Sequence, residues 1–360
     1  MSTYDLVIRG ATLYDGTGAA GRAADLGVRG DRIAAIGTAL DPAGAATLDA
    51  GGLAVAPGFL DVHTHDDFAV VLHPEMGFKV QGGVTSVVVG NCGMGAAPHA
   101  QARGFAAAFH PGQQLPVWDG YAGYLDHLDA APASCNVAAL VGHGAVRAAV
   151  LGGEARAPSD AELDRMRAIV REGVEAGCVG FSTGLIYEPG RYAQADELAA
   201  LAHEFAATGG LYATHMRDEG AGLLDSVRES IGIGERAGVP VQISHHKASG
   251  RENWGKVSES LRLIEDARAR GLDVTADQYP YTAASTVLAA VIGGLEGASG
   301  LGRSGAEDVQ LSSAPQHPEW EGQTIAALAA AWELSPIDAA RRILDAEGIA
   351  ATVVLHVMCE

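Results

Sequence analysis

Short apolar runs follow one another along most of this chain, and the first of them differ in texture from the rest. Residues 4 to 55 carry β-type runs, such as Asp5 to Arg9 and Arg32 to Ile36, between turns at Asp15-Gly16 and Arg29-Gly30-Asp31. This pattern predicts a small β domain over residues 1–56. The texture changes at Ala56-Pro57-Gly58, so we expect a second domain over residues 57–360.

Seven apolar runs in this second region have the length of buried strands and are separated by helical stretches. The runs are Gly58 to His63, Ser86 to Gly90, Val137 to Val141, Val179 to Ser182, Leu211 to Thr214, Val239 to Ser244 and Leu272 to Ala276. Among the helices, one begins at the capping box Ser159-Asp160-Ala161-Glu162, and others are expected over 221–237 and 254–270. The alternation predicts an α/β fold, a (β/α)8 TIM-type barrel whose eighth unit is missing from this sequence.

The segment after Val291 has a looser pattern. Glycines and serines are frequent from Gly293 to Gly302, which favours a long surface loop or lid. A helical pattern follows from Thr324 to Ala346, and a strand-like run begins at Ala351. The chain ends at Glu360, so we expect the barrel to be truncated at its C-terminal side.

Charge and composition narrow the possible partners. The formal net charge of −20 disfavours nucleic acid and anionic membrane surfaces, and it requires a local lysine or arginine if the substrate is a carboxylate. No apolar run is long enough to cross a bilayer, and the start resembles no export signal, so we expect a cytoplasmic protein that does not bind membranes. The four cysteines show no paired spacing, and nothing in the sequence predicts the oligomeric state.

Histidine or cysteine follows four of the predicted strands. His63 and His65 stand two residues apart at the end of one strand, and Cys92, His215 and His245 follow three others. Each residue alone could be an ordinary core side chain. Because barrel enzymes place their active sites at the carboxyl ends of the strands, the repetition favours a metal site with thiolate and imidazole ligands, for one ion or two.

Several segments around these residues resemble a known family. They are Gly58 to Asp67, Asn91-Cys92-Gly93, Gly180 to Gly190, Thr214 to Glu219, Ser244 to Lys247 and Tyr279 to Thr286. In order and rough spacing they are similar to the signatures of the N-acyl-D-amino-acid deacylases, or D-aminoacylases, which are zinc hydrolases of the amidohydrolase superfamily.

The resemblance implies roles for individual residues. Cys92, His215 and His245 would hold a tightly bound Zn²⁺, while His63 and His65 would form a weaker second position. Contacts to the carboxylate or carbonyl of the substrate would come from Lys247, Tyr279 and Ser285, and Tyr187 would line the pocket. Without the resemblance, ordinary packing would account for these last four residues as well.

Two features of the family are expected to lie outside this sequence. The catalytic aspartate of the family follows strand eight, which the resemblance places beyond Glu360, so no catalytic residue is named. The small β domain is completed in the family by strands that follow the barrel, so residues 1–56 are expected to form an incomplete sheet.

The expected activity is zinc-dependent hydrolysis of an N-acyl-D-amino acid to a carboxylate and a D-amino acid. One alternative is a cyclic-amide hydrolase of the hydantoinase or dihydroorotase kind, which is disfavoured because the fourth strand, Val179 to Gly184, lacks the lysine that bridges two metals in many relatives. The other is a truncated, catalytically silent relative that binds metal.

Overall fold

The chain divides into two compact units in the computed structural model, which describes residues 3–110, 112–295 and 305–359. The first unit comprises Met1–Phe59 with Gly83–Thr85, and the second comprises Leu60–Gly82 with Ser86–Glu360. The domain boundary after residue 56 remains a prediction.

The first unit is a small β-sheet. Its strands are β1 (Leu6–Leu13), β2 (Arg22–Arg29), β3 (Arg32–Gly37), β4 (Ala46–Asp49) and β5 (Ala54–Val55), in the order β3-β2-β1-β4 with β5 also paired to β1. Leu13, Ala24 and Leu26 form its buried core, against which Ile8 and Val55 pack. The small β region expected from the alternating pattern is therefore present.

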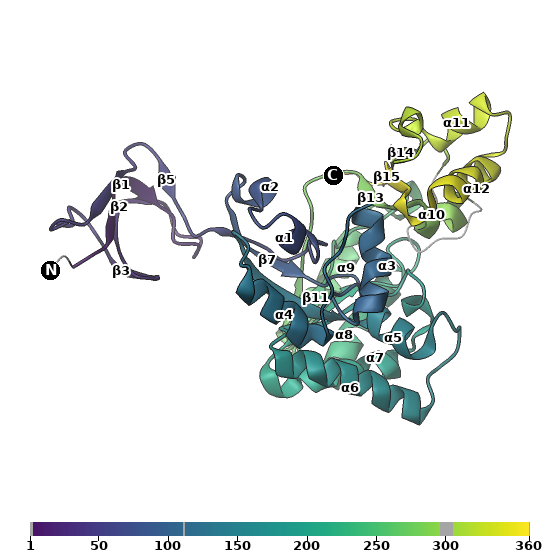
Figure 1. Cartoon of the computed structure of the whole chain (residues 1–360), viewed down its shortest axis with the longest axis horizontal. Coiled ribbons are helices and arrows are strands. Elements are labelled where there is room, and N and C mark those ends of the chain that lie inside the picture. The colour runs from purple at the N-terminus through teal and green to yellow at the C-terminus, as the bar shows by residue number, and fades with distance from the viewer. Residues whose placement is uncertain (1–2, 111, 296–304, 360) are drawn as a thin grey trace. The chain divides into compact units, whose positions relative to one another are not determined.

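The second unit contains a curled parallel sheet of seven strands in sequential order (Figure 1). The strands are β6 (Phe59–Asp61), β7 (Val84–Val89), β8 (Asn136–Gly142), β9 (Gly180–Gly184), β10 (Leu211–His215), β11 (Val241–Ile243) and β12 (Val274–Ala276). Each of the seven predicted strands overlaps one of them. The α/β barrel-type fold predicted from the sequence is confirmed.

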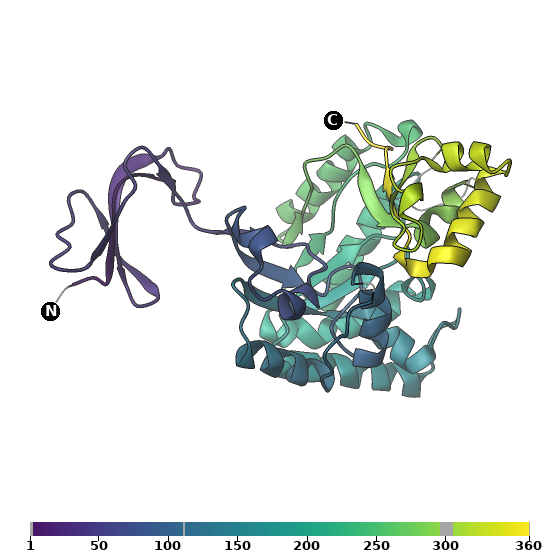
Figure 2. The same ribbon diagram turned by 45° about the horizontal axis from the view of Figure 1, so that its top comes forward.

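Helices connect these strands and cover the outside of the sheet (Figures 1 and 2). They are α1 (Ala69–Leu72), α2 (Gly77–Val80), α3 (His99–Phe109), α4 (Gly120–Ala130), α5 (His143–Leu151), α6 (Asp160–Ala176), α7 (Ala195–Ala202), α8 (Leu223–Ala237) and α9 (Val257–Ala269), with 3-10 turns η1 (Gly190–Tyr192), η2 (His203–Thr208) and η3 (Arg251–Asn253). None of the described helices combines the length and the apolar character needed to cross a bilayer.

The ends of the helices follow the signals in the sequence. The predicted capping box opens α6, where the Ser159 backbone N–H donates to a carboxylate oxygen of Glu162 at 2.8 Å. Gly177 and Gly238, with φ of 103° and 72°, end α6 and α8 in the left-handed conformation that glycine adopts without strain.

The segment after β12 forms a small sheet and helices of its own. Its elements are β13 (Ala284–Val287), α10 (Leu288–Leu295), β14 (Val309–Ser313), η4 (Pro318–Trp320), α11 (Ile325–Ala331), α12 (Pro336–Glu347), η5 (Gly348–Ala350) and β15 (Thr352–Leu355). The three strands pair antiparallel in the order β13-β15-β14 around a core that includes Val309, Leu311, Ile343 and Val353.

The loop expected after Val291 is therefore only partly a loop. Residues 296–304 lie outside the described part of the chain, but β14 follows them, because Val309 and Leu311 alternate with polar neighbours and both pack into the core. The helix expected over 324–346 is present as two helices, since Ser335 caps α12 with Pro336 in its first turn.

Candidate metal centre and pocket

The five residues predicted to bind metal converge at the carboxyl ends of the parallel strands. His63 and His65 follow β6, Cys92 follows β7, His215 ends β10 and His245 follows β11. The Cys92 Sγ lies 3.3 Å from His63 Nε2 and 3.7 Å from His245 Nε2. The rings of His215 and His245 are also neighbours, with centroids 4.4 Å apart.

Glycines let the strand ends approach closely enough to build this cluster. A Cβ at Gly184 would collide with the backbone carbonyl of Cys92, and one at Gly90 would collide with that of Leu140. Cys92 itself has a φ of 55°, which is uncommon for a residue with a side chain. The hydroxyl of Ser182 braces this turn by donating to Gly90 O and accepting from Gly93 N.

The donor atoms fit a zinc site. They form two groups that share Cys92, one with His63 and His65 and the other with His215 and His245, and within each group all donors lie within 4.8 Å of one another. A thiolate and an imidazole bound to one tetrahedral zinc would lie roughly 3.6 Å apart, given bonds of about 2.3 and 2.0 Å. The observed distances of 3.3 and 3.7 Å bracket that value.

The cysteine and the first histidine form an ion pair. Burial alone would raise the pKa of the Cys92 thiol, but the neighbouring His63 imidazole holds it well below its usual range. Burial alone would lower the pKa of His63, but the Cys92 thiolate and Asp277 raise it to about 10. The thiolate required of a zinc ligand is therefore the favoured form of Cys92.

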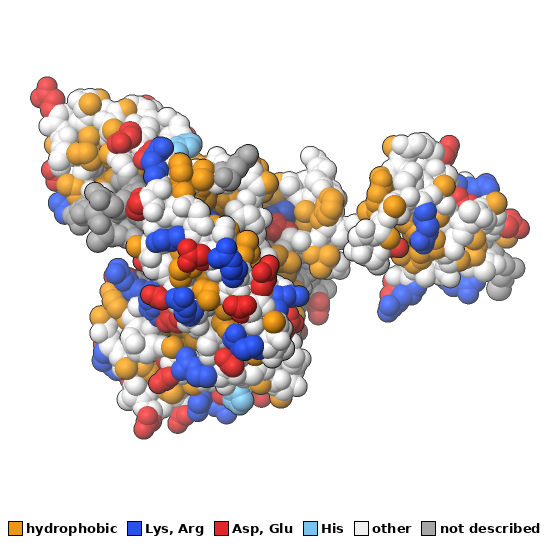
Figure 3. Space-filling view, turned by 180° about the vertical axis from the view of Figure 1, so that it is seen from behind, with side chains coloured by type: hydrophobic (Ala, Val, Ile, Leu, Met, Phe, Trp, Pro, Cys, Tyr) orange, Lys and Arg blue, Asp and Glu red, His pale blue; other side chains and the backbone are white. Residues whose placement is uncertain are grey.

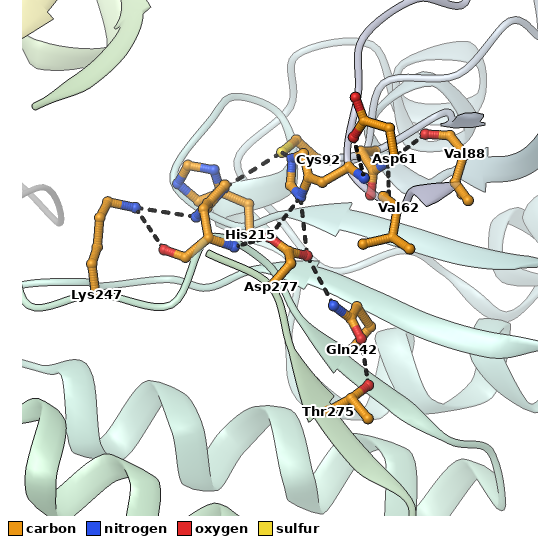
Figure 4. Close-up of polar contacts among 12 residues, drawn as sticks. Asp61, Val62, Val88, Cys92, His215, Gln242, Lys247, Thr275 and Asp277 are labelled. Atoms are coloured by element: carbon orange, nitrogen blue, oxygen red, sulfur yellow. Dashed lines mark hydrogen bonds and ion pairs between the residues drawn. The ribbon is translucent and has the colours of Figure 1, made fainter. Parts of the chain in front are cut away.

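An aspartate that the sequence analysis did not assign braces two of the histidines. The Oδ1 of Asp277 lies 3.3 Å from His63 Nδ1 and accepts a hydrogen bond from the His245 backbone N–H at 2.5 Å. Its other oxygen accepts from Gln242 Nε2 at 3.0 Å, and Thr275 donates to Gln242 in turn (Figure 4). Asp277 directly follows the predicted strand Leu272 to Ala276, and this strand-end position could have marked it as a candidate site residue.

The predicted substrate residues line a pocket at this cluster. Its walls are His65, Cys92, Tyr187, His215, Glu219, His245, Lys247, Tyr279, Ala284, Ser285, Thr286 and Leu355. All four residues implied by the resemblance are present, although Ser285 is largely exposed to solvent. The small sheet formed by β13 and β15 contributes the last four, which shows that this segment completes one wall.

Glu219 is the charged lining residue that sequence reasoning missed. Its side chain is fully buried, with one carboxylate oxygen 2.7 Å from His245 Nδ1 and the other 2.6 Å from Lys247 Nζ. Burial would raise its pKa, but Lys247 and His245 hold it well below its usual range. Its position four residues after His215, within the segment Thr214 to Glu219, was the available signal.

Two further strand-end histidines serve the scaffold. His143 follows β8 and is fully buried, and its Nε2 lies 2.8 Å from Glu197 Oε1. It is absent from the described pocket lining. His246 turns away to Ser260, with its Nε2 2.8 Å from the hydroxyl oxygen. The structure thus selects His245 from the adjacent pair.

Comparisons with known proteins match this chain to amidohydrolases that act on N-acyl-D-amino acids. A model of the amidohydrolase family matches residues 46–331. The chain is 42% identical to N-acyl-D-glutamate deacylase from Alcaligenes xylosoxydans xylosoxydans over 345 residues, and 46% identical to D-aminoacylase from the same organism over 293 residues. These alignments cover 96% and 79% of this chain.

A solved structure is similar throughout. The N-acyl-D-glutamate deacylase of Bordetella bronchiseptica, in complex with zinc and a phosphonate mimic of the tetrahedral intermediate, superposes with a TM-score of 0.88 at 39% identity. The match covers 99% of this chain and 72% of that one. The chain spans 69% and 59% of the two Alcaligenes relatives.

Proposed function

Because this chain belongs to the amidohydrolase family, we propose that it uses zinc to hydrolyse N-acyl-D-amino acids to a carboxylate and a D-amino acid. The observation that carries the proposal is the cluster of Cys92 and four histidines, of which Cys92 and three histidines line a pocket that also contains Lys247. Relatives named for this activity match the chain over most of its length, which supports it further.

We assign the tighter metal position to Cys92, His215 and His245, and a second position to His63 and His65, which share Cys92 with the first. A zinc ion in such a site supplies Lewis acidity, because it favours the ionisation of water near neutral pH and polarises a carbonyl group. Neither ring nitrogen of the buried His215 makes a hydrogen bond within the described part of the chain, which leaves its ring available to a metal.

The substrate carboxylate is proposed to bind at Lys247, with the hydroxyl groups of Tyr279 and Ser285 completing its contacts and Tyr187 forming a wall. Lys247 is the only lysine or arginine among the described residues that line the pocket. It therefore supplies the local positive charge that an anionic substrate needs near a protein of net charge −20.

Glu219 is poorly suited to accept a proton during the reaction, although it lines the pocket. Both of its oxygens are engaged by cationic or proton-bearing groups, and its low pKa makes it a weak base near neutrality. We therefore assign Glu219 no part in proton transfer.

The charges on the surface of the second unit give no support for a polyanion as partner. The face of the second unit seen in Figure 3 mixes acidic and basic side chains, without a broad basic area that would follow a phosphate backbone. We propose no nucleic-acid or membrane partner, and the cytoplasmic location remains a prediction.

The direct test is a comparison of N-acetyl-D-methionine with its L enantiomer. We expect release of D-methionine but not L-methionine, loss of the activity when a chelator removes the metal, and its return with added zinc. Dihydroorotate and hydantoin serve as controls for the cyclic-amide alternative. Faster cleavage of either cyclic amide, or equal rates for the two enantiomers, would contradict the proposal. Zinc binding without turnover of any substrate would favour the catalytically silent alternative.

A further inference from the structure

Glu219 lies where the loops after β10 and β11 meet, and its main chain is held in place. The backbone N–H of Ser249, in the second loop, donates to Glu219 O at 2.8 Å. On the other side, the Gly220 N–H donates to the Asp218 carboxylate at 2.7 Å, and the Asp218 N–H donates to Ser226 Oγ at 3.0 Å. The carboxylate therefore projects from a fixed position.

Its two oxygens face two different functional residues. Oε1 lies 2.7 Å from His245 Nδ1, and Oε2 lies 2.6 Å from Lys247 Nζ. A carboxylate at Nδ1 favours the imidazole tautomer with its proton on that nitrogen. The lone pair is then on Nε2, which is the atom 3.7 Å from Cys92 Sγ.

The same carboxylate compensates a buried cation. Lys247 is 6% exposed, and its ammonium also lies 3.1 Å from His245 Nδ1 and donates to His245 O at 3.1 Å (Figure 4). Two proton-bearing groups so close together repel each other unless a negative charge lies between them. An ammonium buried without a counter-charge is costly. Glu219 supplies that charge.

His245 needs such support because its backbone is strained. Its φ of 36° lies in the left-handed region, which a residue with a side chain seldom adopts. Asp277 holds its backbone N–H, and Glu219 holds its ring. The two carboxylates together fix both the place and the orientation of this imidazole.

We propose that Glu219 is a positioning residue that joins the metal ligand His245 and the substrate anchor Lys247 into one ion-paired unit. The inference rests on the proposed function for the roles of those two partners. It goes beyond that function because it makes zinc affinity and substrate affinity depend on one side chain that is neither a proposed zinc ligand nor a proposed substrate contact.

The test compares Glu219→Gln with Glu197→Gln. Glu197 is a matched control, since it is also a buried carboxylate beside a histidine and a cation, but it does not line the pocket. Zinc affinity is measured by competition with a chromophoric chelator, and the absorption spectrum of the cobalt-loaded protein reports ligand geometry. For Glu219→Gln we expect zinc affinity to fall about 10- to 100-fold, as for carboxylates that orient histidine ligands elsewhere. The cobalt spectrum should change with it, and KM for N-acetyl-D-methionine should rise.

Glu197→Gln should lower thermal stability but leave zinc affinity per folded molecule and the cobalt spectrum unchanged. Glu219→Asp keeps the charge on a shorter side chain, so its zinc affinity should fall between that of the wild type and that of Glu219→Gln. If Glu219→Gln does not fold, the zinc affinity of Glu219→Asp decides whether Glu219 supports zinc binding. Wild-type zinc affinity in the Glu219 variants, or an equal loss in Glu197→Gln, would overturn the proposal. Because the zinc-affinity and cobalt readouts need no turnover, an inactive wild type would refute the proposed function, and these two readouts would still decide this inference.

Discussion

Two buried clusters in the second unit contain the same kinds of side chain, an imidazole, a carboxylate and a cation. In the pocket cluster, Glu219 lies between His245 and Lys247. In the scaffold cluster, Glu197 lies 2.8 Å from His143 Nε2 and 2.6 Å from an Arg147 nitrogen. The difference between them is in what lies beyond the three side chains.

The scaffold cluster is closed by backbone. Arg147 donates to the carbonyl oxygens of Glu154 and Arg156, so its guanidinium ties the loop after α5 to α7. The pocket cluster instead faces a thiolate and a cavity. The same kinds of side chain thus stabilise the fold in one place and, in the other, surround a histidine proposed to bind metal, which residue type alone does not reveal.

Removing the scaffold cation should have the largest effect on stability. Arg147→Ala leaves Glu197 and His143 buried without the guanidinium, and breaking one side of a buried pair costs about 3–5 kcal/mol of the free energy of unfolding. Denaturant unfolding measures this loss. Zinc affinity of the remaining folded protein should match that of the wild type. A loss of zinc affinity without a loss of stability would show that the two clusters are not separate in function.

Removing the Cys92 thiolate, which both proposed metal positions share, should lower zinc affinity rather than stability. Cys92→Ala takes one donor from each proposed metal position, so we expect zinc affinity to fall roughly 100-fold or more, since even residues behind a ligand are worth 10- to 100-fold. Cys178→Ala is the control, because burial raises the pKa of that thiol to about 12 and keeps it protonated. Zinc content after dialysis measures both. Equal zinc content in the two variants would refute the ligand assignment.

The barrel-type fold and the convergence of the candidate metal ligands could be predicted because their signals are local. Strand ends lie where apolar runs stop, and parallel strands end at the same rim, so His63, His65, Cys92, His215 and His245 could be grouped from the sequence. Whether these five bind zinc remains a prediction. The D-aminoacylase resemblance added Tyr187, Lys247, Tyr279 and Ser285, which now lie around one pocket.

Glu219 and Asp277, the carboxylates that contact the candidate metal-binding histidines, could not be identified in the same way. Glu219 and Asp277 each belong to a residue type that is mostly exposed, and the sequence does not show which acidic residue becomes buried. Their contacts cross between segments far apart in the chain, as from Asp277 to His63. The β14 strand was missed for a related reason, since its residues Val309 and Leu311 are buried in a core that segments distant in the sequence build together, β15 among them.

A change of pH should affect the two clusters differently, although the expected changes are smaller than those of the substitutions. In the metal-free protein the pKa of His63 is about 10, so near neutrality its ring carries a proton that must leave before it can bind zinc. Zinc affinity at the position that includes His63 should therefore rise with pH, by about tenfold per unit at most, and level off near 10. The scaffold cluster should respond differently. The pKa of Glu197 is lowered, because His143 and Arg147 outweigh the effect of burial. The stability that Glu197 contributes is therefore present above its unfolded pKa and is lost only as acid protonates it. Between pH 6 and pH 9 the contribution of Glu197 should stay constant while zinc affinity at the position that includes His63 climbs. Denaturant unfolding measures the first at each pH, and chelator competition with enough zinc to fill both positions measures the second. If zinc affinity at the second position did not vary over this range, His63 would not be a ligand there.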